Sequence, residues 1–403
     1  MAAAYYLSRK YDVSLFEKEN RLGGHTHTIP ILTESGPVPV DTGFIVHNER
    51  TYPNLVKLFA ELGVETRPSD MSFSVCCERT GYEYSSRGAN GFFAQRGNLL
   101  RAVHYGLLAE MLRFNREAPK LLPSLHQTDV TLGEFLEQGR FSKGFCDFYL
   151  YPMASAVWST SFDKMREFPA ATLIRFFDNH GMLGIKTHPQ WKVLRGGSHA
   201  YIPALTAPYK DRIFTGVTLT RVQRAEQGIC LEFAGRLPEW FDEVVFACHG
   251  NQTLSLLADA TELERDILQH FLTTRNDTTL HTDESLLPKN ARARASWNYQ
   301  LTGHTASAAT MTYHMNRLQG LDTREQFCVT LNANGQLDRE KVIRKMTYFH
   351  PLYTREAIRA QTRWDEISGK NRTHFCGAYW FYGFHEDGLN SAMRVARALG
   401  VDC

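Results

Sequence analysis

The 403-residue sequence predicts an α/β fold in which two domains exchange segments along the chain. The chain opens with a helix followed by a short buried strand. Its apolar pattern later changes from helical spacing to a period of two, and returns to a helix at the end. No repeat, low-complexity tract or Pro/Ser-rich linker separates these stretches. We therefore expect domains assembled from several segments rather than two consecutive blocks.

The opening stretch has the pattern of the second half of a βαβ unit. Apolar residues at helical spacing run to Arg9, and Val13 to Phe16 is a short strand that ends at Glu17. In dinucleotide-binding βαβ units, an acidic residue at this strand end lies roughly 20 residues after a glycine-rich turn. Counting back roughly 20 residues from Glu17 runs past Met1. We therefore expect an incomplete βαβ unit in this chain, without the first strand and the glycine-rich turn.

The next elements are predicted from apolar spacing and end signals. Residues 53–62 form an amphipathic helix that ends at Gly63, and residues 72–76 carry strand signals. Residues 98–178 are mostly helical, which indicates a helical insertion. In its first helix one face carries Leu99, Val103, Leu107, Met111 and Leu112. We expect this face to pack inside the protein; peripheral contact with a membrane surface is the alternative, because arginines lie beside the leucines.

The second half of the chain is rich in strands. Residues 212–235 and 241–250 alternate with a period of two around glycine-containing turns, and residues 276–331 hold several short strands of a second sheet. The final helix has Leu389, Met393, Ala396 and Leu399 on its apolar face and ends at Gly400.

Composition excludes several classes of protein. A net charge of +2, from 45 basic and 43 acidic residues, gives no field that favours nucleic acid. The eight cysteines form no C-x-x-C pair, so neither a disulfide framework nor a zinc ribbon is indicated, and a reducing cytoplasm is expected. No apolar run approaches the roughly 20 residues of a membrane-spanning helix.

The most informative stretch is FEKENRLGGHTHT, residues 16–28. Glu17 offers a ribose acceptor, Arg21 a phosphate-binding cation, and the pair Gly23 and Gly24 a backbone that a ligand can approach closely. Each feature alone is typical of a surface turn. Together, directly after a helix and a strand, they favour the pyrophosphate of a dinucleotide. Asp41 and Gly43 begin a further turn that is either part of this site or a plain turn.

A second informative stretch, FCGAYWFYGFHEDGLNSAMRVA, lies near the C-terminus. A strand ending at Gly377 is followed by aromatic residues and by a helix that begins near Glu386, Asp387 and Gly388. The free N–H groups and positive dipole of a helix start favour an electron-rich ligand atom, such as the charged edge of a reduced flavin. The alternative is that Glu386 and Asp387 are ordinary acidic residues of a first helical turn.

The stretches FEKENRLGGHTHT, PVDTGFIVHNERTYPNLVKLFAELGV and GAYWFYGFHEDGLNSAM resemble the flavin-containing amine oxidase superfamily. They are most similar to its branch of predicted NAD/FAD-binding proteins associated with cyclopropane-fatty-acid synthases. The resemblance covers essentially the whole chain. It implies an FAD-binding Rossmann-like domain of glutathione-reductase-like topology (residues 1–85, 190–270 and 345–403) and an interleaved α+β substrate domain (residues 86–189 and 271–344).

The resemblance also implies which residues bind FAD. Glu17 would bind the adenosine ribose, and the backbone of Val217 would contact the adenine. His25 departs from the arginine usual in amine oxidases, which argues against assuming an amine substrate. The candidate cofactor-binding residues are Glu17, Arg21, Gly23, Gly24, His25, Asp41, Gly43, Val217, Gly377, Glu386, Asp387, Gly388 and Leu389.

The catalytic residues are not defined by the sequence. Amine oxidases place a lysine near flavin N5, and Lys289 is the lysine with a comparable neighbourhood. Tyr379 and Trp380 are candidates for an aromatic pair. No metal is expected, because His281 with Asp283, and His385 with its acidic neighbours, lack the spacing of a zinc site.

The sequence therefore predicts an FAD-dependent oxidoreductase that transfers a hydride from a C–H bond to flavin N5. The apolar helical insertion favours an apolar substrate, and the family resemblance points to a fatty acyl chain. Two alternatives stay open: a flavin amine oxidase, and a non-catalytic protein of this fold whose incomplete βαβ unit does not hold FAD.

Overall fold

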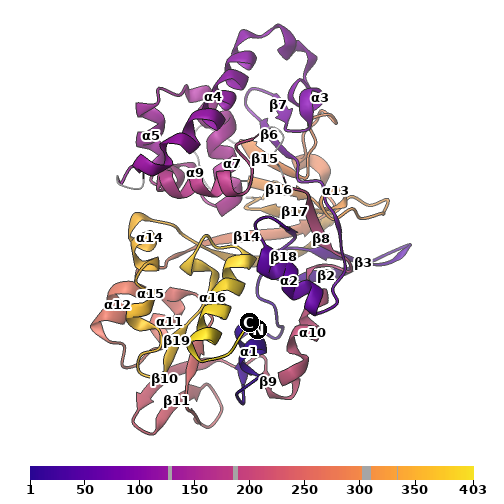
Figure 1. Cartoon of the computed structure of the whole chain (residues 1–403). Coiled ribbons are helices and arrows are strands. Elements are labelled where there is room, and N and C mark those ends of the chain that lie inside the picture. Colours follow the sequence, from indigo (N-terminus) through magenta and orange to yellow (C-terminus); the bar gives the residue numbers. More distant parts are fainter. Residues whose placement is uncertain (126–128, 185–188, 302–309, 334) are drawn as a thin grey trace.

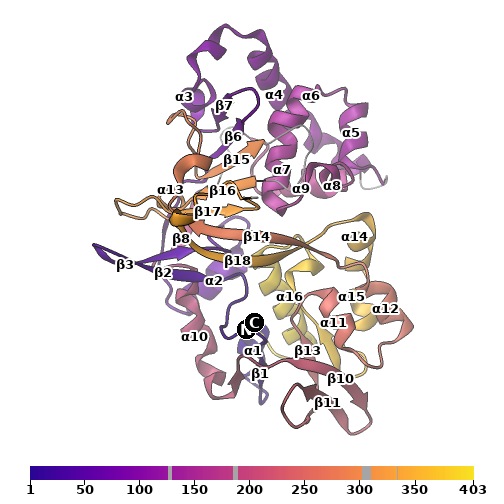
Figure 2. The same cartoon turned by 180° about the vertical axis from the view of Figure 1, so that it is seen from behind.

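The computed structural model describes residues 1–125, 129–184, 189–301, 310–333 and 335–403. Figures 1 and 2 show helices gathered at one end of the molecule, a sheet across the middle, and parallel strands with helices at the end that carries both termini. The predicted α/β class is confirmed.

Two pairs of parallel strands lie near the termini. β1 (Leu15–Phe16) pairs with β9 (Ile213–Phe214), and β13 (Val244–Phe246) pairs with β19 (Thr373–Phe375). Strands from the beginning, middle and end of the chain therefore meet in one region. An antiparallel sheet follows β9 in the chain and is built from β10 (Leu219–Ala225), β11 (Gly228–Phe233) and β12 (Glu239–Phe241).

Helices that share one large apolar core pack around these strands. The first helix packs against the last, and the predicted buried residues Leu389, Met393 and Ala396 are confirmed. Gly63, with φ +67°, follows the end of α2 as predicted. The helices are α1 (Ala2–Leu7), α2 (Pro53–Glu61), α10 (Ile202–Thr206), α11 (Gly250–Leu256), α12 (Glu262–Leu268), α14 (Arg355–Gln361), α15 (Trp364–Ile367) and α16 (His385–Ala398).

In the described part of the chain the central sheet has seven strands, and β6 and β15 are its one parallel pair. In spatial order the strands are β18 (Val342–Pro351), β14 (Thr273–His281), β17 (Cys328–Leu331), β16 (Thr310–His314), β15 (Trp297–Leu301), β6 (Phe73–Cys77) and β7 (Tyr82–Ser85). The predicted second sheet is confirmed. It also takes in strands from residues 73–85 and 342–351, so it crosses the predicted domain boundaries, which stay a prediction.

Smaller elements connect the two ends. β2 (Thr28–Thr33) and β3 (Gly36–Asp41) form a hairpin. A three-stranded sheet has the order β4 (Val46–Asn48), β8 (Trp191–Leu194) and β5 (Thr66–Pro68). A short helix, α13 (Met315–Leu318), follows β16.

The helical insertion is confirmed. Its core contains Phe114, Phe145, Leu173 and Phe177, all fully buried. Its helices are α3 (Gly88–Phe92), α4 (Ala102–Leu125), α5 (Leu132–Gln138), α6 (Lys143–Phe145), α7 (Tyr151–Trp158), α8 (Phe162–Arg166) and α9 (Ala170–Asn179).

The predicted inward face of α4 is wrong. Leu107 is buried, but Leu99, Val103 and Leu112 are exposed. His104 takes the inward position instead of Val103, because its ring stacks on Phe92 and its nitrogens bond to the Tyr82 hydroxyl and the Phe92 carbonyl. A buried histidine whose two ring nitrogens are both hydrogen-bonded leaves no unsatisfied polar atom in the core. Because His104 faces inward, Val103 and Leu112 face solvent.

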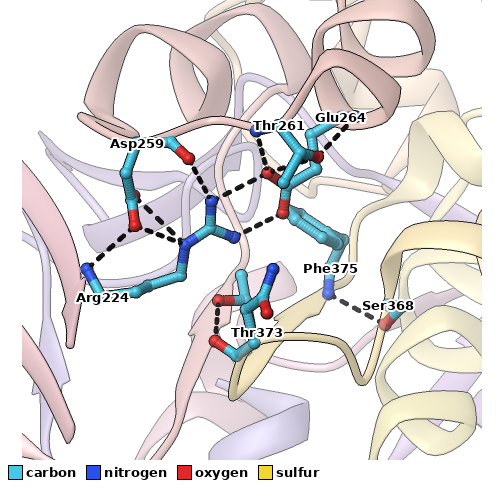
Figure 3. A network of polar contacts seen from close by, with 8 residues as sticks. Arg224, Asp259, Thr261, Glu264, Ser368, Thr373 and Phe375 are labelled. Atoms are coloured by element: carbon cyan, nitrogen blue, oxygen red, sulfur yellow. Dashed lines mark hydrogen bonds and ion pairs between the residues drawn. The ribbon is translucent and has the colours of Figure 1, made fainter. Parts of the chain in front are cut away.

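A buried polar network holds β10 against α12, close to β19 (Figure 3). The guanidinium of Arg224 donates to both carboxylate oxygens of Glu264, at 2.5 and 2.9 Å, and its Nε donates to Asp259 at 3.1 Å. The side chains of Arg224 and Glu264 are only 6% and 2% exposed. Thr261 and Glu264 also form the capping box of α12. Burial raises the pKa of the Glu264 carboxyl, but the hydrogen bonds from Arg224 keep this pKa below its usual value.

Candidate cofactor and substrate site

One cavity of about 2500 Å³ extends from strands β1 and β13 to the helical insertion. Residues of β1 and β13 line one part of it, and residues of α7 and α9 line another. Pockets for ordinary small ligands measure roughly 300–1,000 Å³. This cavity therefore has room for a ligand as long as a dinucleotide together with a second molecule.

Most of the predicted cofactor residues meet at the end of the cavity near β1, which we call the cofactor end. The predicted residues that line it are Glu17, Arg21, Gly23, Gly24, His25, Gly43, Val217, Gly377, Gly388 and Leu389. They come from three distant segments of the chain, and the parallel strands bring them together.

Glu17 stands at the end of β1, beside Val217. Its backbone N–H donates to the Phe214 carbonyl at 2.8 Å, and the Val217 N–H donates to the Glu17 carbonyl at 3.0 Å. One carboxylate oxygen of Glu17 accepts the N–H of Glu19 at 2.9 Å, which fixes the side chain at the cavity wall. The residue predicted to bind a ribose and the residue predicted to contact an adenine are thus held next to each other.

The glycine turn after β1 has a conformation that other residues do not readily adopt. Gly23 has φ +113°, and a Cβ there would lie 2.4 Å from the Thr26 carbonyl oxygen. A Cβ on Gly43 would lie 2.2 Å from the His25 carbonyl oxygen, so a glycine is needed for the close contact between the bend after β3 and this turn. Arg21 donates to the Gly24 carbonyl at 2.8 Å, which holds the turn to the arginine.

Three histidines, each partly buried, lie near this turn. The ring of His25 lies 5.1 Å from the rings of both Tyr348 and His350. His350 Nδ1 accepts from the Asn276 amide at 2.9 Å. His385 stacks on Phe44 at 3.7 Å and bonds to the Thr26 hydroxyl at 3.0 Å.

These histidines are neutral at pH 7. Burial lowers the pKa of His350 to about 4 and that of His385 to about 3, and burial with the neighbouring His350 lowers the pKa of His25 well below its ordinary value. His25 Nε2 is buried and has no hydrogen-bond partner among the described residues. A neutral ring with a spare nitrogen therefore stands where the family resemblance implies an arginine.

Four of the candidate residues lie outside the cavity lining. Glu386 accepts the N–H groups of Asn54 (3.0 Å) and Leu55 (2.8 Å) and so caps the start of α2. Asp387 accepts the Phe384 N–H at 2.9 Å in its own first turn. These contacts match the alternative in which both are structural acidic residues. In Asp41, one carboxylate oxygen accepts the N–H and hydroxyl of Ser198, at 2.8 and 2.9 Å.

Lys289, the catalytic candidate, is the fourth candidate residue outside the cavity lining. Its backbone N–H donates to Glu83 at 2.9 Å, and its side chain is exposed. Of the proposed aromatic pair, Tyr379 lines the cavity and Trp380 does not. Both rings pack against Phe271, with centroid distances of 4.7 and 4.6 Å.

The opposite part of the cavity, the substrate end, has an apolar lining that the sequence did not reveal. It is contributed by β6, α7, α9, β8, β15 and β16, whose side chains there are Phe73, Met153, Ala156, Val157, Phe176, Trp191, Trp297 and Tyr313. Asp70 also lines it, but donation from Arg317 at 3.2 Å satisfies this carboxylate. The buried indole N–H of Trp297 has no partner within the described residues. No single sequence motif contains these residues, so only the fold identifies them.

The residues of the cofactor end fit FAD. An acidic residue at the end of a parallel strand, a glycine turn that a Cβ would fill, and the first turn of the fourteen-residue helix α16, at His385 and Gly388, all face one cavity. His25 Nε2 remains free to bond to a ligand. This arrangement is that of a Rossmann-like dinucleotide-binding site.

The sequence matches the family model described as flavin containing amine oxidoreductase over residues 1–326. The chain belongs to this family, and its cofactor is FAD. No curated protein matches the sequence significantly. The narrower branch associated with cyclopropane-fatty-acid synthases stays a prediction.

Solved structures share the fold across nearly the whole chain. Cyclohexylamine oxidase from Brevibacterium oxydans IH-35A superposes with a TM-score of 0.69 at 13% identity, covering 99% of this chain and 96% of that one. A putative protoporphyrinogen oxidase from Exiguobacterium sp. 255-15 gives 0.68 at 16% identity, with 99% and 95% covered. A CLA-producing fatty acid isomerase from P. acnes gives 0.67 at 15% identity, with 99% and 96% covered.

Proposed function

We propose that this protein is an FAD-dependent oxidoreductase that removes a hydride from a C–H bond of an apolar, acyl-chain substrate. FAD supplies the hydride acceptor, at N5 of its flavin. The substrate also loses a proton from the neighbouring carbon and gains a C=C bond, and a separate acceptor reoxidises the reduced cofactor. The observation that carries the proposal is the apolar substrate end, which is continuous with the cofactor end in one cavity.

The chemistry of the lining favours an alkyl chain over an amine. A protonated amine is best held by a free carboxylate, but Asp70 is already bonded to Arg317. Lys289, the lysine that an amine oxidase mechanism would use, lies outside the cavity. The side chains of Met153, Val157 and Phe176 instead provide dispersion contacts along the wall.

The fold is compatible with such a substrate, since the fatty acid isomerase that it resembles acts on a fatty acid. The unpaired indole N–H of Trp297 gives the substrate end one hydrogen-bond donor without a charge. In our proposal, Trp297 bonds to a polar group of the acyl substrate and the alkyl chain occupies the rest of the wall.

The first experiment is a visible absorption spectrum of the purified protein with and without added FAD. We expect a bound-flavin spectrum; a protein that stays colourless after FAD addition contradicts the proposal. In anaerobic mixing experiments, bleaching of the flavin by fatty acyl substrates supports the acyl assignment. Bleaching by amines alone overturns it in favour of an amine oxidase.

The substrate end is tested separately with Val157→Phe. The larger ring would fill part of the apolar chamber, so we expect turnover of acyl substrates to fall at least about tenfold while the flavin spectrum is kept. Val38→Phe is the matched control, because Val38 is also half-buried but lies on β3, outside the cavity. Equal turnover in Val157→Phe and the wild type would contradict the placement of the substrate.

A further inference from the structure

Three exposed apolar side chains cluster at the start of α4 and are called here the apolar tip. Leu100 is 93% exposed, Val103 is 83% exposed and Leu99 is 46% exposed. Figures 1 and 2 place the segment between α3 and α4 at the end of the molecule opposite to β10 and β11. Single exposed leucines are common on protein surfaces, and Leu32 and Leu237 are examples here. Three exposed apolar side chains within five residues of one projecting turn are uncommon.

The tip is held in this exposed position by the structure around it. The 3₁₀ turn Arg96–Leu100 precedes α4, and its Asn98 is buried. His104 faces inward on the next turn, stacked on Phe92 at 4.1 Å. Because Asn98 and His104 take the inward positions on either side, Leu100 and Val103 point away from the core. Their exposure is therefore a property of the folded turn.

The charged residues of the segment that carries the tip have one sign. Between Glu83 and Glu110 the sequence contains Arg87, Arg96 and Arg101 and no Asp or Glu. All three arginines are exposed. Arginines beside exposed leucines are the side-chain combination that binds anionic lipid surfaces, since the cations meet the headgroups while the apolar groups enter the acyl boundary.

A second basic segment packs against this one. The Asn290 amide donates to the Ala94 carbonyl at 2.8 Å, and the Ser85 hydroxyl donates to the Arg292 carbonyl at 3.2 Å. The side chains of Lys289 and Arg292 are exposed. The nearby carboxylate of Glu83 is buried and accepts the N–H groups of Lys289 and Asn290, so it contributes little negative charge to the surface.

The tip is also connected to the cavity. Ser86 and Arg87, in the same acid-free segment, belong to the cavity lining. We propose that the apolar tip and its arginines dock this protein on the surface of an anionic phospholipid bilayer, with Leu99, Leu100 and Val103 in the headgroup region. This docking is independent of the proposed substrate, and it places the Arg87 side of the cavity near the lipid.

The test is cosedimentation of the FAD-loaded protein with vesicles of phosphatidylcholine containing phosphatidylglycerol, and with vesicles of phosphatidylcholine alone. We expect binding to the anionic vesicles that weakens as salt is added. The double variant Leu100→Asp/Val103→Asp should bind them at least about tenfold more weakly. Leu237→Asp is the matched control, because Leu237 is 85% exposed but lies on the turn between β11 and β12.

Circular dichroism and the flavin spectrum verify that each variant is folded, which is expected because the changed side chains are exposed. Absence of wild-type binding to anionic vesicles overturns the proposal, and so does equal binding by the double variant. Self-association that the double variant abolishes, without vesicle binding, would instead assign the tip to a contact between two copies of the chain.

Discussion

The two ends of the cavity are built in different ways. The cofactor end depends on backbone conformation and polar support: a glycine turn with φ +113° at Gly23 and the hydrogen bonds between Glu17 and its neighbours. The Arg224 network lies outside the cavity lining and joins β10 to α12 in the same part of the molecule. The substrate end depends on apolar packing by side chains from six separate elements. A single substitution should therefore disrupt the cofactor end, whereas the substrate end should tolerate changes that keep its volume and apolar character.

The largest effect is expected from Arg224→Met. The change would leave the buried Glu264 carboxylate without its partner, and breaking a buried ion pair in this way costs about 3–5 kcal/mol of unfolding free energy. Denaturant unfolding of wild type and variant measures the difference. In the control Arg116→Ala, an exposed pair with Glu117 is lost and the cost should stay below about 1 kcal/mol. Similar losses of unfolding free energy in both variants would show that the buried network stabilises the fold no more than an exposed ion pair does.

A smaller and more local effect is expected from Gly23→Ala. A Cβ would meet the Thr26 carbonyl at 2.4 Å in a backbone conformation that alanine rarely adopts, so the turn must shift. We expect a strain of about 2 kcal/mol, which corresponds to FAD binding weakened roughly 30-fold. Fluorescence titration with FAD provides the measurement. Gly106→Ala, where a Cβ meets open space on α4, should bind FAD as the wild type does.

The contrast between the two ends of the cavity also explains which site residues could be predicted from the sequence. The motif around Glu17, Gly23 and Gly24 is local, and ten of the thirteen predicted cofactor residues line the cavity. Tyr348 and His350 were missed, because β18 reaches the glycine turn only through the order of strands in the central sheet. The α4 face was predicted wrongly, since spacing alone does not reveal that His104 would be bonded at both nitrogens and face inward.

A pH-dependent effect is expected at Asp387, which the motif placed at the cofactor and which lies outside the cavity lining. Burial raises the pKa of Asp387 to about 7, whereas in the unfolded chain it has its ordinary value near 3.8. As the pH rises from about 4 to about 7 the unfolded chain loses this proton first, so the wild type loses stability over this window and the loss levels off above pH 7.

Asp387→Asn removes the titration but keeps an oxygen that accepts the Phe384 N–H. The stability difference between the variant and the wild type should therefore move in favour of the variant by about 2–3 kcal/mol between pH 5 and pH 8. Thermal unfolding at the two pH values measures this difference, in which the titration of the buried histidines cancels. If Asp387 instead bound the cofactor directly, Asp387→Asn would weaken FAD binding, and FAD titration of the same variant separates a structural from a binding role.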